Sequence, residues 1–296
     1  PWRFGLASAA GVPIPAELWR TAPSTIRRWG VQVPMVEVER RFALAPDAAA
    51  AGVLSSRGYV DLVSVAAAQD EPADAVQDKA EQLRRAFVLA DLSARVAAIS
   101  SFGSGESGGY AGRVLVARAA ARVSAVDLDD AQAYHLIAAM FAGGYDRNAM
   151  AWAAQIPVGS QAWGLLAVGS PRPLVGVNAG LVDDFSSDDE STDRHRTKFL
   201  AAALIGLGRV ERADANTLAS DYSLGLNTST RWTQAIDDAA DRGEAGTVAL
   251  LAAVGLQGRG WDGVPAYHIY HITNALRRVG LGADARMIAA EAVTRG

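Results

Sequence analysis

Three stretches of the chain share one pattern, in which an apolar run with helical spacing ends at a glycine and an alanine-rich run begins a few residues later. Glycine takes the left-handed conformation that ends a helix without steric cost, and small residues beside it let two antiparallel helices approach closely. The pattern predicts helical hairpins whose turn glycines have positive φ. The stretches are residues 136–154, 199–219 and 272–293, aligned on Gly144, Gly208 and Gly280.

A fourth, degenerate hairpin lies between the second and third stretches. Residues 229–242 have a Ser/Thr start and Gly243 as a stop, and they pair with residues 247–256. The run Gly-Tyr-x-x-x-Ala-x-x-Trp-Ala that ends at Ala153 resembles the helix-turn-helix of tetratricopeptide and Sel1-like repeats. This resemblance covers about half of the chain and lacks the fixed period of those families. It implies a right-handed superhelix that binds partners in a concave groove, and it implies no reaction.

The composition supports the same fold class. Alanine, the residue with the highest helix propensity, dominates the chain, and β-branched residues seldom alternate with polar ones. We therefore expect an all-α fold, an α-α superhelix or solenoid of irregular antiparallel helical hairpins. It is either continuous or divided near a glycine-rich loop into an N-terminal helical segment, residues 1–100, and a C-terminal hairpin array, residues 113–296.

Prolines divide the first third of the chain into short segments, because proline is tolerated only in the first turn of a helix. Pro13, Pro15, Pro23, Pro34 and Pro46 are the dividing residues. The segments predict short helices at residues 16–20, 25–29 and 34–44. Two longer helices are expected at residues 56–69 and 74–90, the second with a buried stripe at three-and-four spacing.

Charge and cysteine usage exclude several classes of function. The 28 basic and 32 acidic residues give a net charge of −4, and the basic ones are scattered, so we expect no nucleic-acid partner. Arginine greatly outnumbers lysine, which we attribute to genome composition. There is no cysteine, which excludes disulfides, thiolate zinc sites and cysteine nucleophiles.

The longest uncharged stretch, residues 148–171, has Gln155, Pro157, Ser160 and Gln161 in its middle. We interpret it as a helix, a turn and a second helix, so we expect a soluble protein without a membrane span. The chain begins at Pro1 without a methionine, so we expect that its natural start has been removed. An export signal could therefore have preceded the chain, and this slightly favours the periplasm over the cytoplasm.

The glycine-rich loop carries two patterns that are typical of enzymes. Gly103, Gly105 and Gly108 fit the G-x-G-x-x-G spacing of a dinucleotide site, and Asp127 lies near the expected position of a ribose-binding acid. That site needs a strand before the first glycine and a parallel sheet to join, and nothing downstream alternates strand with helix. We therefore favour a flexible connection and expect no cofactor.

The same loop fits the G-x-S-x-G nucleophile elbow, with Ser107 as the nucleophile. An elbow needs a sheet and a histidine base, and only four histidines are present: His135, His195, His268 and His271. The Glu106-Ser107 pair also resembles the catalytic dipeptide of lytic transglycosylases, some of which carry a large helical superhelix. The rest of that catalytic domain is not recognisable, so we assign no catalytic residue and lean against an enzyme.

Two further clusters suggest metal binding. The acidic run at residues 183–193 lacks the glycine and the spacing of an EF-hand, so we interpret it as a solvated loop that favours the positive end of the following helix. His268 and His271 stand three residues apart and share a helix face, but two ligands are too few for zinc. We expect no metal site.

The most plausible contact residues are aromatic side chains near the C-terminal end of the chain. Trp261, Tyr267, Tyr270 and His271 are a candidate surface for a protein or peptide partner. Packing between hairpins is the alternative role for the same residues. The leading functional hypothesis is a non-catalytic helical-repeat scaffold or protein-binding protein. The alternative is an accessory superhelical domain of a cell-envelope enzyme that acts on peptidoglycan.

Overall fold

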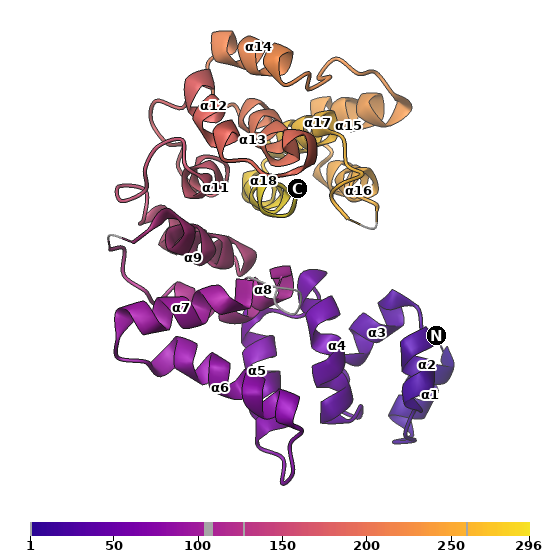
Figure 1. Cartoon of the computed structure of the whole chain (residues 1–296). Coiled ribbons are helices and arrows are strands. Elements are labelled where there is room, and N and C mark those ends of the chain that lie inside the picture. Colours follow the sequence, from indigo (N-terminus) through magenta and orange to yellow (C-terminus); the bar gives the residue numbers. More distant parts are fainter. Residues whose placement is uncertain (1, 104–108, 127, 259) are drawn as a thin grey trace. The chain divides into compact units, whose positions relative to one another are not determined.

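The computed structural model describes residues 2–103, 109–126, 128–258 and 260–296, and these residues form helices and no strand. The predicted all-α class is therefore confirmed (Figure 1). The chain divides into two compact units, unit 1 from Pro1 to Ser124 and unit 2 from Ala125 to Gly296. This division falls after the helix that follows the glycine-rich loop.

Unit 1 is built around its last helix. That helix, α8, packs against four preceding helices, α4, α5, α6 and α7. Its apolar residues surround the helix axis, and nearly all of them are buried, which is typical of a helix enclosed by others. The helices of unit 1 are α1 (Trp2–Ala9), α2 (Ala16–Thr21), α3 (Ser24–Gly30), α4 (Val38–Ala50), α5 (Ser56–Ala67), α6 (Asp74–Val88), α7 (Leu92–Gly103) and α8 (Gly109–Ala120).

The proline-divided segments of unit 1 form helices close to the predicted positions, with one exception. Pro46 was expected to separate two segments, but it lies inside α4, which begins at Val38 rather than at residue 34. Proline inside a helix removes one backbone hydrogen bond. Ala45, Ala48 and Ala49 beside it are buried against neighbouring helices, and this tertiary packing stabilises α4 across the proline.

Unit 2 contains the predicted hairpins. Residues 199–219 lie in α13 and α14, residues 229–256 in α15 and α16, and residues 272–293 in α17 and α18. In the first hairpin, residues 136–154, the second helix is short. The helices of unit 2 are α9 (Asp130–Ala142), α10 (Asp146–Met150), α11 (Gln161–Gly169), α12 (Ala179–Ser187), the 3-10 helix η1 (Thr192–Arg194), α13 (His195–Gly206), α14 (Arg212–Asp221), α15 (Arg231–Asp241), α16 (Ala245–Gly255), α17 (Ala266–Arg278) and α18 (Gly282–Arg295).

The turn glycines have the predicted conformation. Gly144, Gly208 and Gly280 have φ values of 77°, 66° and 85°, and Gly243 has a φ of 72°. At Gly280, the next amide, Leu281 N, donates to Leu276 O at 2.8 Å, and the glycine's own amide donates to Arg277 O at 3.2 Å. This pair of bonds closes the helix end as a Schellman motif. Equivalent pairs are present at the other three glycines.

The last helix of unit 2 packs against helices from both its beginning and its end. The C-terminal helix α18 packs against α17, its hairpin partner, and against α9, α11 and α13, which come much earlier in the chain (Figure 1). In a solenoid each repeat contacts only its neighbours in the sequence. The contacts of α18 extend beyond such neighbours, so they tie the beginning of unit 2 to its end.

Glycines inside helices of unit 2 allow backbones and rings to approach closely. A Cβ atom on Gly206 of α13 would lie 2.1 Å from Thr273 Oγ1 and 2.7 Å from Tyr270 O, both in α17. A Cβ atom on Gly164 of α11 would lie 2.4 Å from Cε2 of Phe185. Real Cβ contacts of this kind are sterically excluded, so these positions require glycine.

Arginine side chains bind the C-terminal ends of helices to which they do not belong. Arg209 donates to Ala167 O and, at 2.5 Å, to Ser170 O at the end of α11. Arg286 of α18 donates to Gly169 O of the same end at 3.3 Å. A positive charge is favoured there because the last carbonyls of a helix lack partners and carry partial negative charge. Further examples are Arg41 on Val31 O after α3, Arg277 on Gly206 O of α13 and Arg196 on Val293 O of α18.

The uncharged stretch at residues 148–171 contains the end of α10, a series of turns and all of α11. It is therefore two short helices joined by a turn region, as expected. Among the residues that the structure describes, no helix has the length and apolar character needed to cross a membrane.

The left-handed turn at Gly280 gives a direct test of the hairpin geometry. We expect Gly280→Ala to lower the free energy of unfolding by about 1–2 kcal/mol, because an L-residue at positive φ brings its Cβ too close to the backbone. The measurement is chemical denaturation of both proteins. Gly282→Ala, two residues later in the first turn of α18, is the control and should not destabilise, since nothing lies within 4 Å of its added Cβ. Equal losses for both variants would contradict the assignment.

The close approach of α13 and α17 gives a second test. Gly206→Ala should destabilise the protein by about 1–3 kcal/mol, the usual cost of overpacking a filled interface. Gly5→Ala, inside α1 with open space around it, should leave the stability unchanged or raise it. The measurement is the thermal unfolding temperature of the two variants and of the parent protein. A Gly206→Ala variant as stable as the parent would show that the helices can separate without cost.

Candidate functional site

The predicted contact residues separate into two groups. Tyr267, Tyr270 and His271 lie on α17, where the His271 ring centroid is 5.1 Å from that of Tyr270 and 6.5 Å from that of Tyr267. Trp261 precedes this helix and packs edge-to-face on Phe199 of α13 at 5.9 Å. Trp261 and the two tyrosines are half-buried, whereas His271 is only 7% exposed. His271 therefore offers almost no surface to a partner.

Both histidines of α17 are engaged in hydrogen bonds between helices. The Nδ1 atom of His268 lies 2.9 Å from Gly255 O at the end of α16, and its ring stacks on Trp232 at 4.2 Å. The Nδ1 atom of His271 lies 3.0–3.1 Å from the carboxylate oxygens of Asp237 in α15. These contacts join α17 to α15 and α16. No group of metal-binding side chains occurs in the described part of the chain.

The helix α16 is apolar on its exposed side as well as on its buried side. Residues 245–256 contain no charged side chain, yet only Val248 and Ala252 of α16 are buried. Leu250 is 71% exposed and Val254 is 49% exposed. Such a helix normally carries polar residues on the face turned to water. Its outer face is therefore a candidate contact surface.

The glycine-rich loop does not have the surroundings that its enzyme patterns need. Residues 104–108 and Asp127, which include Gly105, Glu106, Ser107 and Gly108, lie outside the described residues. The apolar run before Gly103 would have to be a strand in a dinucleotide site or a nucleophile elbow. It is instead the end of α7, which runs to Gly103, and α8 begins at Gly109.

The acidic loop before α13 uses its carboxylates within the protein. Asp189 accepts hydrogen bonds from Thr197 N at 2.8 Å, from Thr197 Oγ1 at 2.6 Å and from Ser191 N at 2.9 Å. Burial alone would raise the pKa of Asp189, but the bonds from Ser191 and Thr197 outweigh it, so the pKa is lowered. Asp193 pairs with Lys198. Asp189 thus binds the first turn of α13, as the sequence predicted for this loop. The prediction of a solvated loop was wrong in part, because Asp183 and Asp184 lie in α12 and Asp189 is half-buried.

A polar cavity of about 320 Å³ lies within unit 2, where the first turns of three helices meet. Asp130 and Ala131 begin α9, Gln161 begins α11, and Arg196 is the second residue of α13. The remaining lining residues are Tyr134, His135, Ser160 and Asp188. The lining therefore contains both positive and negative groups. The sequence analysis considered Asp188 within the acidic run and His135 as a possible base, but it did not connect them with each other or with Arg196.

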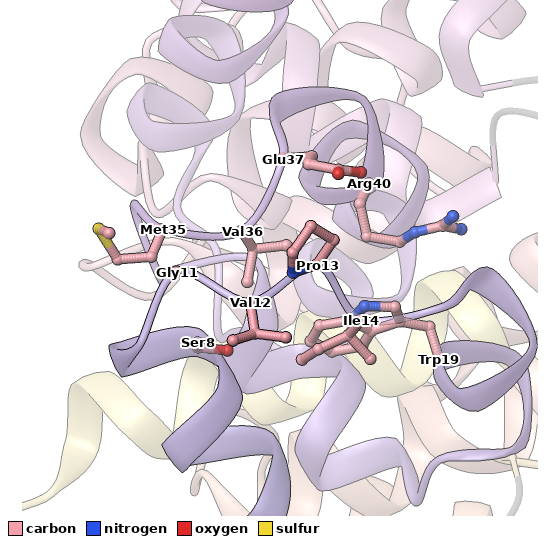
Figure 2. A pocket seen from close by; sticks show the side chains of 10 residues that line it. All are labelled: Ser8, Gly11, Val12, Pro13, Ile14, Trp19, Met35, Val36, Glu37 and Arg40. Carbon is pink, nitrogen blue, oxygen red and sulfur yellow. The ribbon is translucent and has the colours of Figure 1, made fainter.

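A smaller pocket of about 210 Å³ lies in unit 1 (Figure 2). Its walls combine apolar side chains, among them Val12, Ile14, Trp19 and Met35, with the polar side chains of Ser8 and Glu37. Arg40 also lines it, but Figure 2 shows its guanidinium group extending away from Val12 and Val36. The pocket offers apolar contacts and does not define a chemical class of ligand.

The hydrogen bonds of Asp189 predict an acid-dependent stability. A carboxyl whose pKa is lowered by folding stabilises the protein above its unfolded pKa of 3.8 and loses that effect as the pH falls through the lowered folded value. Asp189→Asn should therefore lower the free energy of unfolding by about 1–3 kcal/mol at neutral pH. The difference from the parent protein should shrink below about pH 4. Denaturation at several pH values measures this, with the exposed neighbour variant Asp188→Asn as control. A difference that does not change with pH would contradict it.

Comparison with protein-family models, with curated proteins and with solved structures finds no match. The functional argument therefore depends on the residues themselves. Two features carry chemical information: the outer face of α16, which is apolar and exposed, and the polar cavity of unit 2, which is lined by charged side chains.

Proposed function

We propose that the protein is a non-catalytic helical scaffold that binds a protein or peptide partner, and that the outer face of α16 is the main contact surface. The observation that carries the proposal is the exposure of α16, an uncharged helix of which two residues are buried. Single exposed apolar residues are common on protein surfaces, but a continuous apolar face indicates a contact site.

The position of α16 in the fold supports this role. It packs against α15, its hairpin partner, and against α17. In proteins built from stacked helical hairpins, each apolar face is covered by the next hairpin, and a terminal hairpin normally has a polar outer face. The outer face of α16 lacks a further hairpin and charged residues, and Thr247 in its first turn is its one exposed polar side chain. A helix from a partner can therefore take the place of the next hairpin.

The shape of the face suits a helix. Gly246, Ala249 and Ala253 are small and exposed on one side of it, and Leu250 and Val254 project on the other. Positions 246, 249, 250, 253 and 254 share one helix face because each is three or four residues from another of the set. Small side chains permit close approach and the two larger ones fill grooves. The partner segment is therefore an amphipathic helix with an apolar stripe.

Two finer elements belong to the same proposal. We infer that the hairpins α15–α16 and α17–α18 stack as in a superhelical repeat protein, since α15 and α16 both pack on α17. Trp261, Tyr267 and Tyr270 remain candidate contact residues through the exposed parts of their rings. His271 supports them from inside the hairpin interface.

The proposal is tested by adding one charge to the outer face of α16. The parent protein and the Leu250→Glu variant are used to capture partners from the native organism after cross-linking, and the retained proteins are quantified by mass spectrometry. We expect a partner that the parent retains in near-stoichiometric amount and that Leu250→Glu loses, because burying an unpaired carboxylate in the interface is costly.

Val175→Glu is the matched control, since Val175 is fully exposed in unit 2 but lies outside α16. This variant should retain the same partner as the parent. Light scattering of the purified protein adds a separate readout, because loss of a dimer in Leu250→Glu would identify the partner as a second copy of the chain. The proposal would be overturned if the parent, Leu250→Glu and Val175→Glu retained the same proteins and had the same molar mass in light scattering.

A further inference from the structure

The polar cavity of unit 2 contains a positive charge that is held in place by neutral groups. Arg196 donates through Nε to Val293 O at 2.9 Å and through one terminal nitrogen to the hydroxyl oxygen of Tyr134 at 3.0 Å. Its guanidinium carbon also lies 5.4 Å from the centroid of the Tyr134 ring. In the described part of the chain it forms no ion pair. Arg196 is therefore an oriented cation without a protein counter-ion, with a second terminal nitrogen left to bind a ligand.

The same cavity contains two negative charges. Asp130 and Asp188 line it, both are exposed, and neither pairs with a basic residue among the described residues. With Arg196 they give the lining a net charge of about −1 at neutral pH. A purely anionic ligand would be repelled by the two carboxylates, and a purely cationic one would leave Arg196 unpaired. A ligand that carries both kinds of charge satisfies all three groups.

We propose that this cavity binds a small molecule or peptide end that carries one carboxylate and at least one ammonium group, with a basic α-amino acid as the best match. Its carboxylate pairs with Arg196, and its ammonium groups lie against Asp130 and Asp188. The cavity of about 320 Å³ lies in the size range of small-ligand sites.

This inference does not depend on the α16 proposal, since the two sites share no residue. Two sources could supply the ligand: a free basic amino acid or the C-terminal basic residue of a peptide. Both present the same carboxylate and side-chain ammonium group. They differ at the α-nitrogen, which is charged in the free amino acid and acylated in the peptide.

The test is isothermal titration calorimetry of the full chain with four probes: L-lysine, Nα-acetyl-L-lysine, L-lysinamide and L-glutamate. We expect saturable binding of L-lysine or of its acetyl derivative. L-lysinamide, which lacks the carboxylate, and L-glutamate, which has a carboxylate in place of the second ammonium group, should each bind at least about tenfold more weakly. Tighter binding of L-lysine identifies the free amino acid, and equal binding of its acetyl derivative identifies the peptide end.

Variants separate this site from general charge effects. Asp188→Asn and Asp130→Asn should each weaken L-lysine binding by about tenfold, and Arg196→Lys should weaken it because it removes the planar donor fork while keeping the charge. Asp262→Asn, an exposed aspartate outside the cavity, should bind like the parent. Circular dichroism and thermal unfolding check that each variant is folded. Absence of saturable binding, equal binding of L-lysinamide, or unchanged affinity in both aspartate variants would overturn the inference.

Discussion

The fold depends on satisfying the carbonyl groups at the ends of its helices with side chains from other parts of the chain. A chain of many short helices has many such ends, and each leaves up to four carbonyls without a helical partner. The C-terminal end of α11 shows the solution most clearly, because Arg209 and Arg286 bind three of its carbonyls from two different elements. Burial, followed by repulsion from Arg286, lowers the pKa of Arg209 to about 10, which still leaves it charged at neutral pH. Packing and hydrogen bonding therefore stabilise the same helix pairs.

The sequence predicted those parts of the fold that depend on local chemistry. Gly144, Gly208 and Gly280 mark helix ends because the left-handed conformation is a property of the residue itself. Pro46 was misinterpreted because burial of the neighbouring alanines, which the sequence does not reveal, stabilises the helix across it. The excess of arginine was attributed to composition, whereas several arginines bind helix ends far away in the sequence. The packing of α18 on α9 is also a long-range contact, and no spacing in the sequence indicates it.

The candidate sites also combine features that the sequence shows with features that depend on long-range packing. The sequence assigned residues 247–256 to a hairpin helix, and α16 covers this range except for its last residue, but the exposure of its outer face depends on which helices surround it. The sequence left two roles open for His271, a contact surface or packing between hairpins, and its burial and its bond to Asp237 in α15 agree with packing. The cavity around Arg196 could not be predicted, because it forms where the beginnings of three helices converge. The serines and aspartates that cap these helices identify the helix starts but do not indicate which of them meet.

The order of the helices has a consequence for how the protein is made. In each unit the last helix to be synthesised, α8 in unit 1 and α18 in unit 2, packs against four other helices of that unit. Until that helix leaves the ribosome, the apolar surfaces that it later covers remain in water, where they can bind chaperones or other nascent chains. Unit 1 can complete its core while unit 2 is still being translated. In unit 2 the contacts of α18 with α9, α11 and α13 can form only after residues 282–295 have been synthesised.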